Sequence, residues 1–265
     1  PLTPSQEDAF LLAEGFDFTR LVTWGDRLNS QGETFGMNND FTAFLPFDPA
    51  DPLDGILLVN HEFPTPLLLG TEADANKKTP EQVRREQLVV GASLVHVRYN
   101  SELEQWQVVA DSKYNRRLNG QTQIPFSAFH SIMGSKMAYG TMANCGGGVT
   151  PWGTFLSCEE NYQDYYGDFS STKSDRLKVD TSKTEYHWWR EVARSPAHYG
   201  WVVEINPTTG ETRKQVSLGR FGHEMATIVE LPDGRVVAYL GDDKDNECLY
   251  KFVSAHPKSL ETGEL

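Results

Sequence analysis

The sequence predicts an all-β protein, more specifically a β-propeller with irregular insertions and one or two short helices. Short runs rich in β-branched and aromatic residues recur at 55–59, 93–99, 105–109, 153–157, 201–205 and 226–231. Turn residues at 206–210 and 232–234 each join two such runs in the pattern of a hairpin. From residue 200 the hairpins follow one another at a spacing that suits four-stranded propeller blades of about 40–45 residues. A plain antiparallel sandwich is the alternative fold.

Helix is the minority state in this sequence. Thr79 is a favourable N-cap and Pro80 a favourable first helical residue, so a helix is predicted to begin there. Residues 5–12 are a weaker candidate for a second helix. The polar stretches 113–136 and 163–198 are expected to be irregular insertions. We expect residues 1–265 to form either a single β-propeller domain, complete or incomplete in this chain, or the N-terminal portion of a longer one.

Charge and composition argue against two classes of protein. The 265 residues include 24 Lys and Arg against 37 Asp and Glu, which gives a formal net charge of −13. A nucleic-acid-binding protein would need a basic face for phosphates, so no nucleic-acid partner is expected. No apolar run approaches the roughly 20 residues that span a bilayer, so no membrane span is expected. Acidic side chains are, however, the ligands that hard cations prefer.

Four acidic clusters lie at or beside the ends of apolar strands. They are Glu62 in NHE after GILLV, Glu159 and Glu160 in CEEN after GTFLS, Glu224 in GHE before MATIVEL, and Asp242 and Asp243 in GDD after VVAYL. Strand ends of several blades converge on one mouth of a propeller channel. Converging carboxylates repel one another unless cations hold them, so the clusters predict a polynuclear metal site. For any single cluster, and for Asp40 in NNDF, a solvated turn is the alternative.

A cysteine before three glycines is a further candidate ligand. Cys145 precedes glycines 146–148, which allow positive φ and a close approach of the backbone to a neighbour. Its position shortly before the CEEN motif suggests a thiolate on a metal. The other two cysteines, Cys158 and Cys248, are expected to be small buried hydrophobes.

Two histidines and one arginine flank the acidic motifs. His61 and His223 each precede a glutamate by one residue, and successive strand residues point to opposite faces. If the glutamates face the channel, the histidines face the blade interior. Arg220 lies just before the GHE motif and is the candidate catalytic residue near the same mouth.

These motifs, in this order, resemble the PhoX-type alkaline phosphatases. The string GTMANCGGGVTPWGTFLSCEEN spans 140–161, with VNHE at 59–62, YGWVVEINP at 199–207 and GRFGHE at 219–224. FDFTRLVTWGDRL and TFGMNNDFTAFLP, between residues 16 and 46, and GDD followed by ECLYKFV fit the same family. The resemblance therefore runs in order across nearly the whole chain.

The resemblance implies a calcium- and iron-dependent β-propeller phosphatase, periplasmic or secreted, with export by the twin-arginine route. It implies two Fe³⁺ and several Ca²⁺ ions that share an oxo bridge at the propeller mouth. By motif, Cys145 corresponds to the cysteine ligand of iron, and Glu62, Glu224 and one of Glu159 and Glu160 to the iron-binding glutamates. Glu160 is preferred for iron and Glu159 for calcium, and Asp242 and Asp243 resemble ligands on the calcium side.

The expected function is metal-dependent hydrolysis of small-molecule phosphate monoesters by a monomeric enzyme. The bound cations would neutralise the phosphate charge and orient the group for attack. One alternative is a calcium-dependent, lactonase-like propeller hydrolase, which needs neither a thiolate nor iron. The other is a propeller that binds metal without catalysis.

Overall fold

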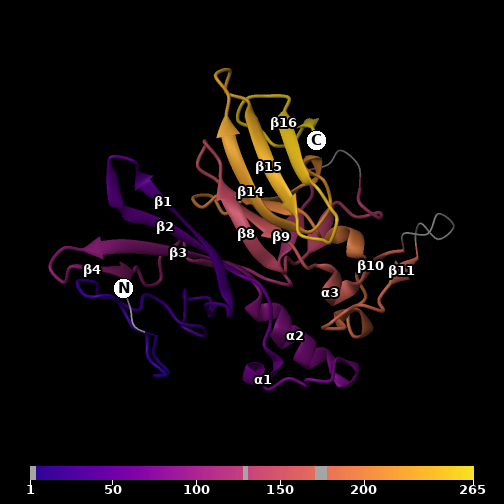
Figure 1. The fold of residues 1–265 in the computed structure, drawn as a ribbon, viewed down its shortest axis with the longest axis horizontal. Helices are drawn as coiled ribbons and strands as arrows, with labels where there is room; N and C mark the ends of the chain where they lie inside the picture. Colours follow the sequence, from indigo (N-terminus) through magenta and orange to yellow (C-terminus); the bar gives the residue numbers. More distant parts are fainter. Residues whose placement is uncertain (1–3, 128–130, 171–177) are drawn as a thin grey trace.

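A computed structural model describes residues 4–127, 131–170 and 178–265. The first three residues, and parts of the two predicted insertions at 128–130 and 171–177, lie outside the described residues. Most of the strands in this part of the chain belong to three antiparallel sheets (Figure 1). Their strand orders are β1-β2-β3-β4 with β5 added beside β3, then β8-β9-β12-β13, then β14-β15-β16-β17.

The strands of each sheet have the following bounds. The first sheet contains β1 (Asn39–Asp48), β2 (Asp51–His61), β3 (Gly91–Asn100), β4 (Gln105–Val108) and β5 (Arg116–Leu118). The second contains β8 (Asn144–Val149), β9 (Phe155–Glu159), β12 (Val202–Ile205) and β13 (Thr212–Gln215). The third contains β14 (His223–Glu230), β15 (Val236–Asp242), β16 (Leu249–Ser254) and β17 (Gly263–Glu264). Two small ribbons pair β6 (Gln123–Pro125) with β7 (Met137–Tyr139), and β10 (Asp168–Phe169) with β11 (Val179–Asp180).

The first strand of each sheet lies on the inside, and later strands are added outward. Strand β8 contacts both β1 and β14, so the three inner strands lie beside one another. The sheet of β8 and β9 accordingly lies between the other two in Figure 1. This is how the blades of a β-propeller are built, and it confirms the predicted fold class. Within the described part of the chain the three sheets do not close into a ring.

The hairpins are grouped differently from the even spacing predicted from residue 200 onward. Strands β12 and β13 pair with β9 and complete the second sheet, whereas β14 starts a new one. The residues from 160 to 201 are an insertion within the second sheet, between β9 and β12. Local turn signals revealed both hairpins, but the pairing of β9 with β12 is non-local and leaves no local signal.

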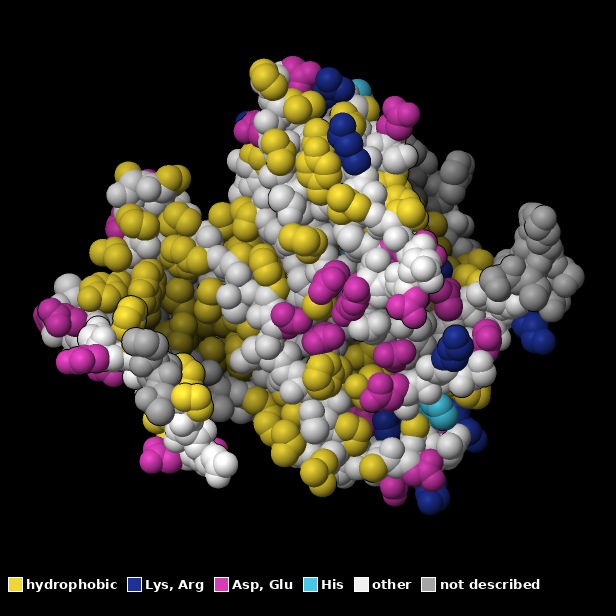
Figure 2. Space-filling view, in the orientation of Figure 1, with side chains coloured by type: hydrophobic (Ala, Val, Ile, Leu, Met, Phe, Trp, Pro, Cys, Tyr) yellow, Lys and Arg dark blue, Asp and Glu magenta, His cyan; other side chains and the backbone are white. Residues whose placement is uncertain are grey.

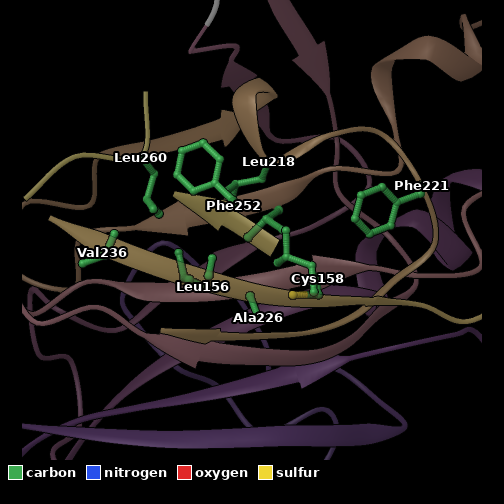
Figure 3. Packing of buried hydrophobic residues seen from close by; sticks show 11 residues of the cluster. Leu156, Cys158, Leu218, Phe221, Ala226, Val236, Phe252 and Leu260 are labelled. Carbon is green, nitrogen blue, oxygen red and sulfur yellow. The ribbon is translucent and has the colours of Figure 1, made fainter. Parts of the chain in front are cut away.

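Apolar side chains fill the two spaces between neighbouring sheets. Between the second and third sheets lie Leu156, Cys158, Val202, Ala226, Val236, Ala238, Leu240 and Phe252, all fully buried or nearly so. Figure 3 shows members of this cluster lying together between the strands. Between the first and second sheets lie Ile56, Leu58, Ala92, Leu94, Phe155, Val203 and Ile205. Because these side chains leave water on folding, the sheets are held face to face.

The predicted helix is present as α2 (Pro80–Val89). Thr79 accepts a hydrogen bond from the amide of Gln82, whose side chain accepts one from the amide of Thr79, and the two bonds form a capping box. Two further helices are single turns, α1 (Pro66–Leu69) and α3 (Gln163–Tyr166). Residues 5–12 form no helix, so that expectation was wrong. The segment is exposed, and a short helix without packing partners does not offset its nucleation cost.

An aromatic cluster anchors the insertion that follows β9. Tyr166 of α3 stacks on Tyr199 with ring centroids 5.0 Å apart. The ring centroid of Tyr165 lies 4.4 Å from that of Trp188. Trp188 donates from Nε1 to Glu86 of α2, so the insertion and the helix are bonded to each other. No helix in the described part of the chain is long and apolar enough to cross a membrane.

Candidate metal centre

The same local irregularity occurs at the inner edge of all three sheets. At this edge the inner hairpins begin with the opposed pairs Asn39–His61, Asn144–Glu159 and His223–Asp242. The next opposed pairs are Thr42–Val59, Gly147–Ser157 and Ala226–Leu240. In each case two residues of the inner strand face one residue of its partner, which is a β-bulge. A bulge re-aims side chains, and here it does so at the corresponding position of three blades.

The residues at these bulges and at the ends of the facing strands carry six anionic or thiol groups. They are Asp40 and Glu62 in the first sheet, Cys145 and Glu160 in the second, and Glu224 and Asp243 in the third. Ligand atoms of Asp40, Glu62 and Cys145 all lie within 4.8 Å of one another. The side chains of Glu160 and Asp243 are hydrogen-bonded to each other. On the face shown in Figure 2, acidic side chains gather near the middle.

Burial and the charges of neighbouring acids raise the pKa values of Glu62, Cys145 and Glu160. Burial, together with the neighbouring carboxylates of Asp40 and Glu224, raises the pKa of Glu62. Burial and the hydrogen bond that protonated Glu160 donates to Asp243 raise the pKa of Glu160 to about 8, and the charge of Glu62 adds to the shift. The pKa of the Cys145 thiol is raised by burial and by the acids around it. Negative charge at this site is therefore costly without a cation.

Two of the three glycines after Cys145, Gly146 and Gly148, allow the second and third sheets to touch. A Cβ atom on Gly146 would lie 1.8 Å from the carbonyl oxygen of Glu224, and one on Gly148 would lie 2.0 Å from that of Ala226. None of the three adopts positive φ, so the expected left-handed turn is absent and close approach is their role. This contact brings Cys145 and Glu224 to the same place.

Asn60 fixes the bulge that carries Cys145. Its Nδ2 donates to the carbonyl oxygens of Cys145 at 2.7 Å and Gly146 at 2.8 Å. Its Oδ1 accepts from the hydroxyl of Ser157 at 2.8 Å, and Asn144 donates to that same hydroxyl. Asn60 is fully buried, so these bonds are made away from solvent. Asn60 lies within the NHE motif, but no local pattern in the sequence distinguishes it from a turn residue.

The two histidines lie where the alternation of strand residues predicts. His61 and His223 are completely buried in the blade interior, and burial lowers the pKa of each, that of His223 to about 4. His61 Nε2 lies 2.7 Å from the hydroxyl of Ser93, and His223 Nε2 lies 3.1 Å from the carbonyl of Gly219. Both rings therefore support the adjacent glutamates from the opposite face of the strand.

Glu159 does not lie among the six candidate metal donors. Its carboxylate lies 2.5 Å from Nζ of Lys214 and accepts a hydrogen bond from the amide of Trp201 at 3.0 Å. Both charged side chains are completely buried. Because consecutive strand residues alternate between faces, Glu159 points into the blade and Glu160 toward the other donors. The conjecture of Glu159 as a calcium ligand therefore has no support from this geometry.

Arg220 and Asp242 lie in a groove beside the group rather than within it. Arg220 donates to Asp168 at 2.9 Å and to the carbonyl oxygens of Tyr199 and Pro196. Asp242 accepts from the amide of Gly222 at 3.1 Å. The groove also contains Lys244, Asp168 and Glu247. The catalytic role of Arg220 and the ligand role of Asp242 stay predictions.

The two remaining cysteines differ from each other. Cys158 is completely buried in the core between the second and third sheets, as expected for a small hydrophobe. Cys248 is exposed, contrary to expectation, because it lies in the loop before β16 rather than inside the strand. All three cysteines are free.

Fold and site together define a protein of the β-propeller class with a candidate metal centre at the inner edge of its blades. The chain belongs to the PhoX alkaline phosphatase family, because the family model for "Alkaline phosphatase PhoX" matches residues 1–264. It is similar to a solved structure of Pseudomonas fluorescens PhoX in complex with vanadate, a transition state analogue, with 30% identity and a TM-score of 0.80. The match covers 94% of this chain and 51% of that one, so this chain spans about half the length of its structural relative. No curated protein matches the chain.

Proposed function

We propose that this chain holds a polynuclear metal centre of two Fe³⁺ and several Ca²⁺ ions for the hydrolysis of phosphate monoesters. The observation that carries the proposal is the threefold bulge, which aims donors from three sheets at one place. The chain's membership of the PhoX family, and its similarity to a PhoX structure bound to a transition-state analogue, support the same reaction.

The donor set fits such a centre chemically. Five carboxylates suit hard cations such as Ca²⁺, and a thiolate is a softer ligand that suits a transition metal such as iron. Burial, and after it the charge of neighbouring carboxylates, raises the pKa values of Glu62 and Glu160, and bound cations would offset both effects. Burial favours the protonated thiol of Cys145. A bound metal would favour the thiolate instead.

The residues of this chain would divide the work as follows. Asp40, Glu62 and Cys145 lie within reach of one shared ion, and Glu160 with Asp243 extends the set toward the third sheet. Asn60 holds the bulge, so the thiol keeps its orientation. When bound, the cations would neutralise the charge of the phosphate and orient it.

An activity assay with a matched pair of variants tests the proposal. Glu224 and Glu230 lie on the same strand, one at the inner edge and one at the far end, and both are exposed. We expect Glu224→Gln to abolish both bound metal and hydrolysis of an aryl phosphate at alkaline pH, and Glu230→Gln to change neither.

The alternatives give different results when lactone hydrolysis and bound calcium are measured beside the phosphatase assay. Lactone hydrolysis with calcium alone would favour a lactonase-like hydrolase, in which the thiol has no role. Bound calcium without any turnover would favour a propeller that binds metal without catalysis. Either result would overturn the proposed phosphatase function.

A further inference from the structure

Arg117 of β5 is a buried cation whose bonds go to neutral groups. The residue is 6% exposed, and burial lowers the pKa of its guanidinium to about 9. In the described part of the chain, the guanidinium donates to the carbonyl oxygens of Leu88 at 3.1 Å and Val90 at 2.7 Å, and to the hydroxyl of Ser93 at 3.3 Å. A buried charge that forms no ion pair lowers stability, which points to a role beyond stabilisation of the fold.

A chain of hydrogen bonds leads from Arg117 to His61. The hydroxyl oxygen of Ser93 lies 3.3 Å from Nη1 of Arg117 and 2.7 Å from Nε2 of His61. A guanidinium only donates, so the serine oxygen accepts from Arg117, and the hydrogen of the hydroxyl goes to Nε2, the acceptor beside it. The ring hydrogen of neutral His61 is therefore on Nδ1. The carbonyl group of Met37 attracts this Nδ1–H, although their geometry falls short of a full hydrogen bond.

The His61 ring lies between the segments that carry two of the proposed metal donors. It lies against the backbone of Gly36, where a Cβ atom would be only 2.5 Å from Cγ of the histidine. The residue after the histidine is Glu62, whose amide donates to the carbonyl oxygen of Asn38 at 3.1 Å. Asp40 follows Asn38 by two residues, and its ligand atom lies within 4.8 Å of that of Glu62. The orientation of the ring therefore sets the separation of the two carboxylates.

We propose that Arg117 and Ser93 are positioning residues for the candidate metal centre. They hold the His61 ring in its Nδ1–H form, and the ring keeps Asp40 and Glu62 at the spacing that a shared cation requires. This inference rests on the proposed function and deepens it. Residues behind the ligands of a metal fix the orientation of those ligands, and their loss typically weakens metal binding by about 10–100-fold.

Nitrogen-15 NMR of the metal-free protein near neutral pH tests the direction of these hydrogen bonds, because the shifts of the two ring nitrogens show which one carries the hydrogen. We expect the hydrogen of His61 on Nδ1. His223 is the matched comparison: its Nε2 lies 3.1 Å from the carbonyl oxygen of Gly219, which only accepts, so its hydrogen should be on Nε2. A hydrogen on Nε2 of His61 would overturn the inference.

Calcium titration of the metal-free protein tests the effect on the site. Ser93→Ala removes the link between Arg117 and His61, so calcium affinity should fall by about tenfold or more. Ser93→Thr keeps the hydroxyl and should retain most of the affinity. Ser254→Ala is the matched control, because Ser254 is also almost fully buried and its hydroxyl accepts from the amide of Val236, at the far end of the third sheet. It should lower stability and leave calcium affinity unchanged.

Unchanged calcium affinity in Ser93→Ala would overturn the inference alone. An equal loss of affinity in Ser254→Ala would do the same, because lower stability would then be the cause. An unaltered protein that binds neither calcium nor iron would instead overturn the proposed function, and the inference with it.

Discussion

The carboxylate of Glu159 and the ammonium of Lys214 form an ion pair 2.5 Å long that is completely buried. Lys214 also donates to the carbonyl oxygen of His198 at 2.8 Å and lies over the ring of Tyr199. The pair connects β9 to β13 across the second sheet and fixes the end of β9, from which Glu160 projects. Two adjacent glutamates thus have separate roles, one in the fold and one at the candidate metal centre.

The first prediction concerns this ion pair. Glu159→Gln leaves the Lys214 charge buried without its partner, so we expect the free energy of unfolding to fall by about 3–5 kcal/mol. Urea denaturation of the metal-free proteins measures the change. Glu159→Leu combined with Lys214→Met removes both charges and should restore most of the loss. An unchanged unfolding midpoint in the single variant would contradict the structural role of the pair.

The second prediction separates Glu160 from Glu159. Above pH 8, where Glu160 is ionised, Glu160→Gln relieves repulsion among carboxylates, so the metal-free variant should be at least as stable as the unaltered protein. It also removes a proposed ligand, so we expect bound iron and calcium to fall and phosphatase activity to be lost. Elemental analysis of the folded protein decides this. Full metal content in Glu160→Gln would exclude this residue from the centre.

The third prediction concerns the contact between the second and third sheets. Gly148→Ala places a methyl group 2.0 Å from the carbonyl oxygen of Ala226, so strands β8 and β14 must separate. Overpacking of this kind typically costs about 1–3 kcal/mol, and metal content should fall because Cys145 and Glu224 move apart. Gly241→Ala is the control, since no atom lies within 4 Å of its Cβ position. Equal stability of the two variants would show that the close approach is unimportant.

The fourth prediction concerns the pH dependence of the metal-free protein. The pKa of Glu160 is about 8 in the folded state against 4.5 normally, so between these values the folded state retains a proton that the unfolded state releases. The contribution of Glu160 to stability therefore falls as pH rises through this window. Between pH 6.5 and 8, the stability of the unaltered protein relative to Glu160→Gln should decline. A rising difference would show that burial and repulsion do not act on this carboxyl group.

Metal binding should show the opposite trend in the same window. Ligands must lose their protons to bind a cation, so affinity for calcium and iron is expected to increase as pH rises toward 8. An affinity for metal that increases with pH agrees with an enzyme that binds its metal ions under alkaline conditions.

Much of the fold and part of the site were predictable from local patterns in the sequence. Alternating strands and turn residues revealed the hairpins, and the Thr79–Pro80 start revealed α2, because these signals act over a few neighbouring residues. The acidic motifs at strand ends placed Glu62 and Glu224 at the same edge. The inward direction of His61 followed from the period of two along a strand.

The remaining features depend on contacts between distant segments. The threefold bulge is a matter of strand register, which no single motif encodes. Glu159 and Glu160 could not be distinguished by motif, because the partner of Glu159 is a lysine 55 residues away. Asn60 supports Cys145 across 85 residues.

Elemental analysis of the purified protein, combined with the phosphatase assay, tests the central claim most directly. Iron and calcium should be present together, and Cys145→Ala should lose iron and activity in parallel while the protein stays folded. The iron-loaded protein should be purple or violet, since thiolate-bound ferric ions absorb visible light. If Cys145→Ala retained its iron and its full turnover, the account of a shared metal centre at the three bulges would be wrong.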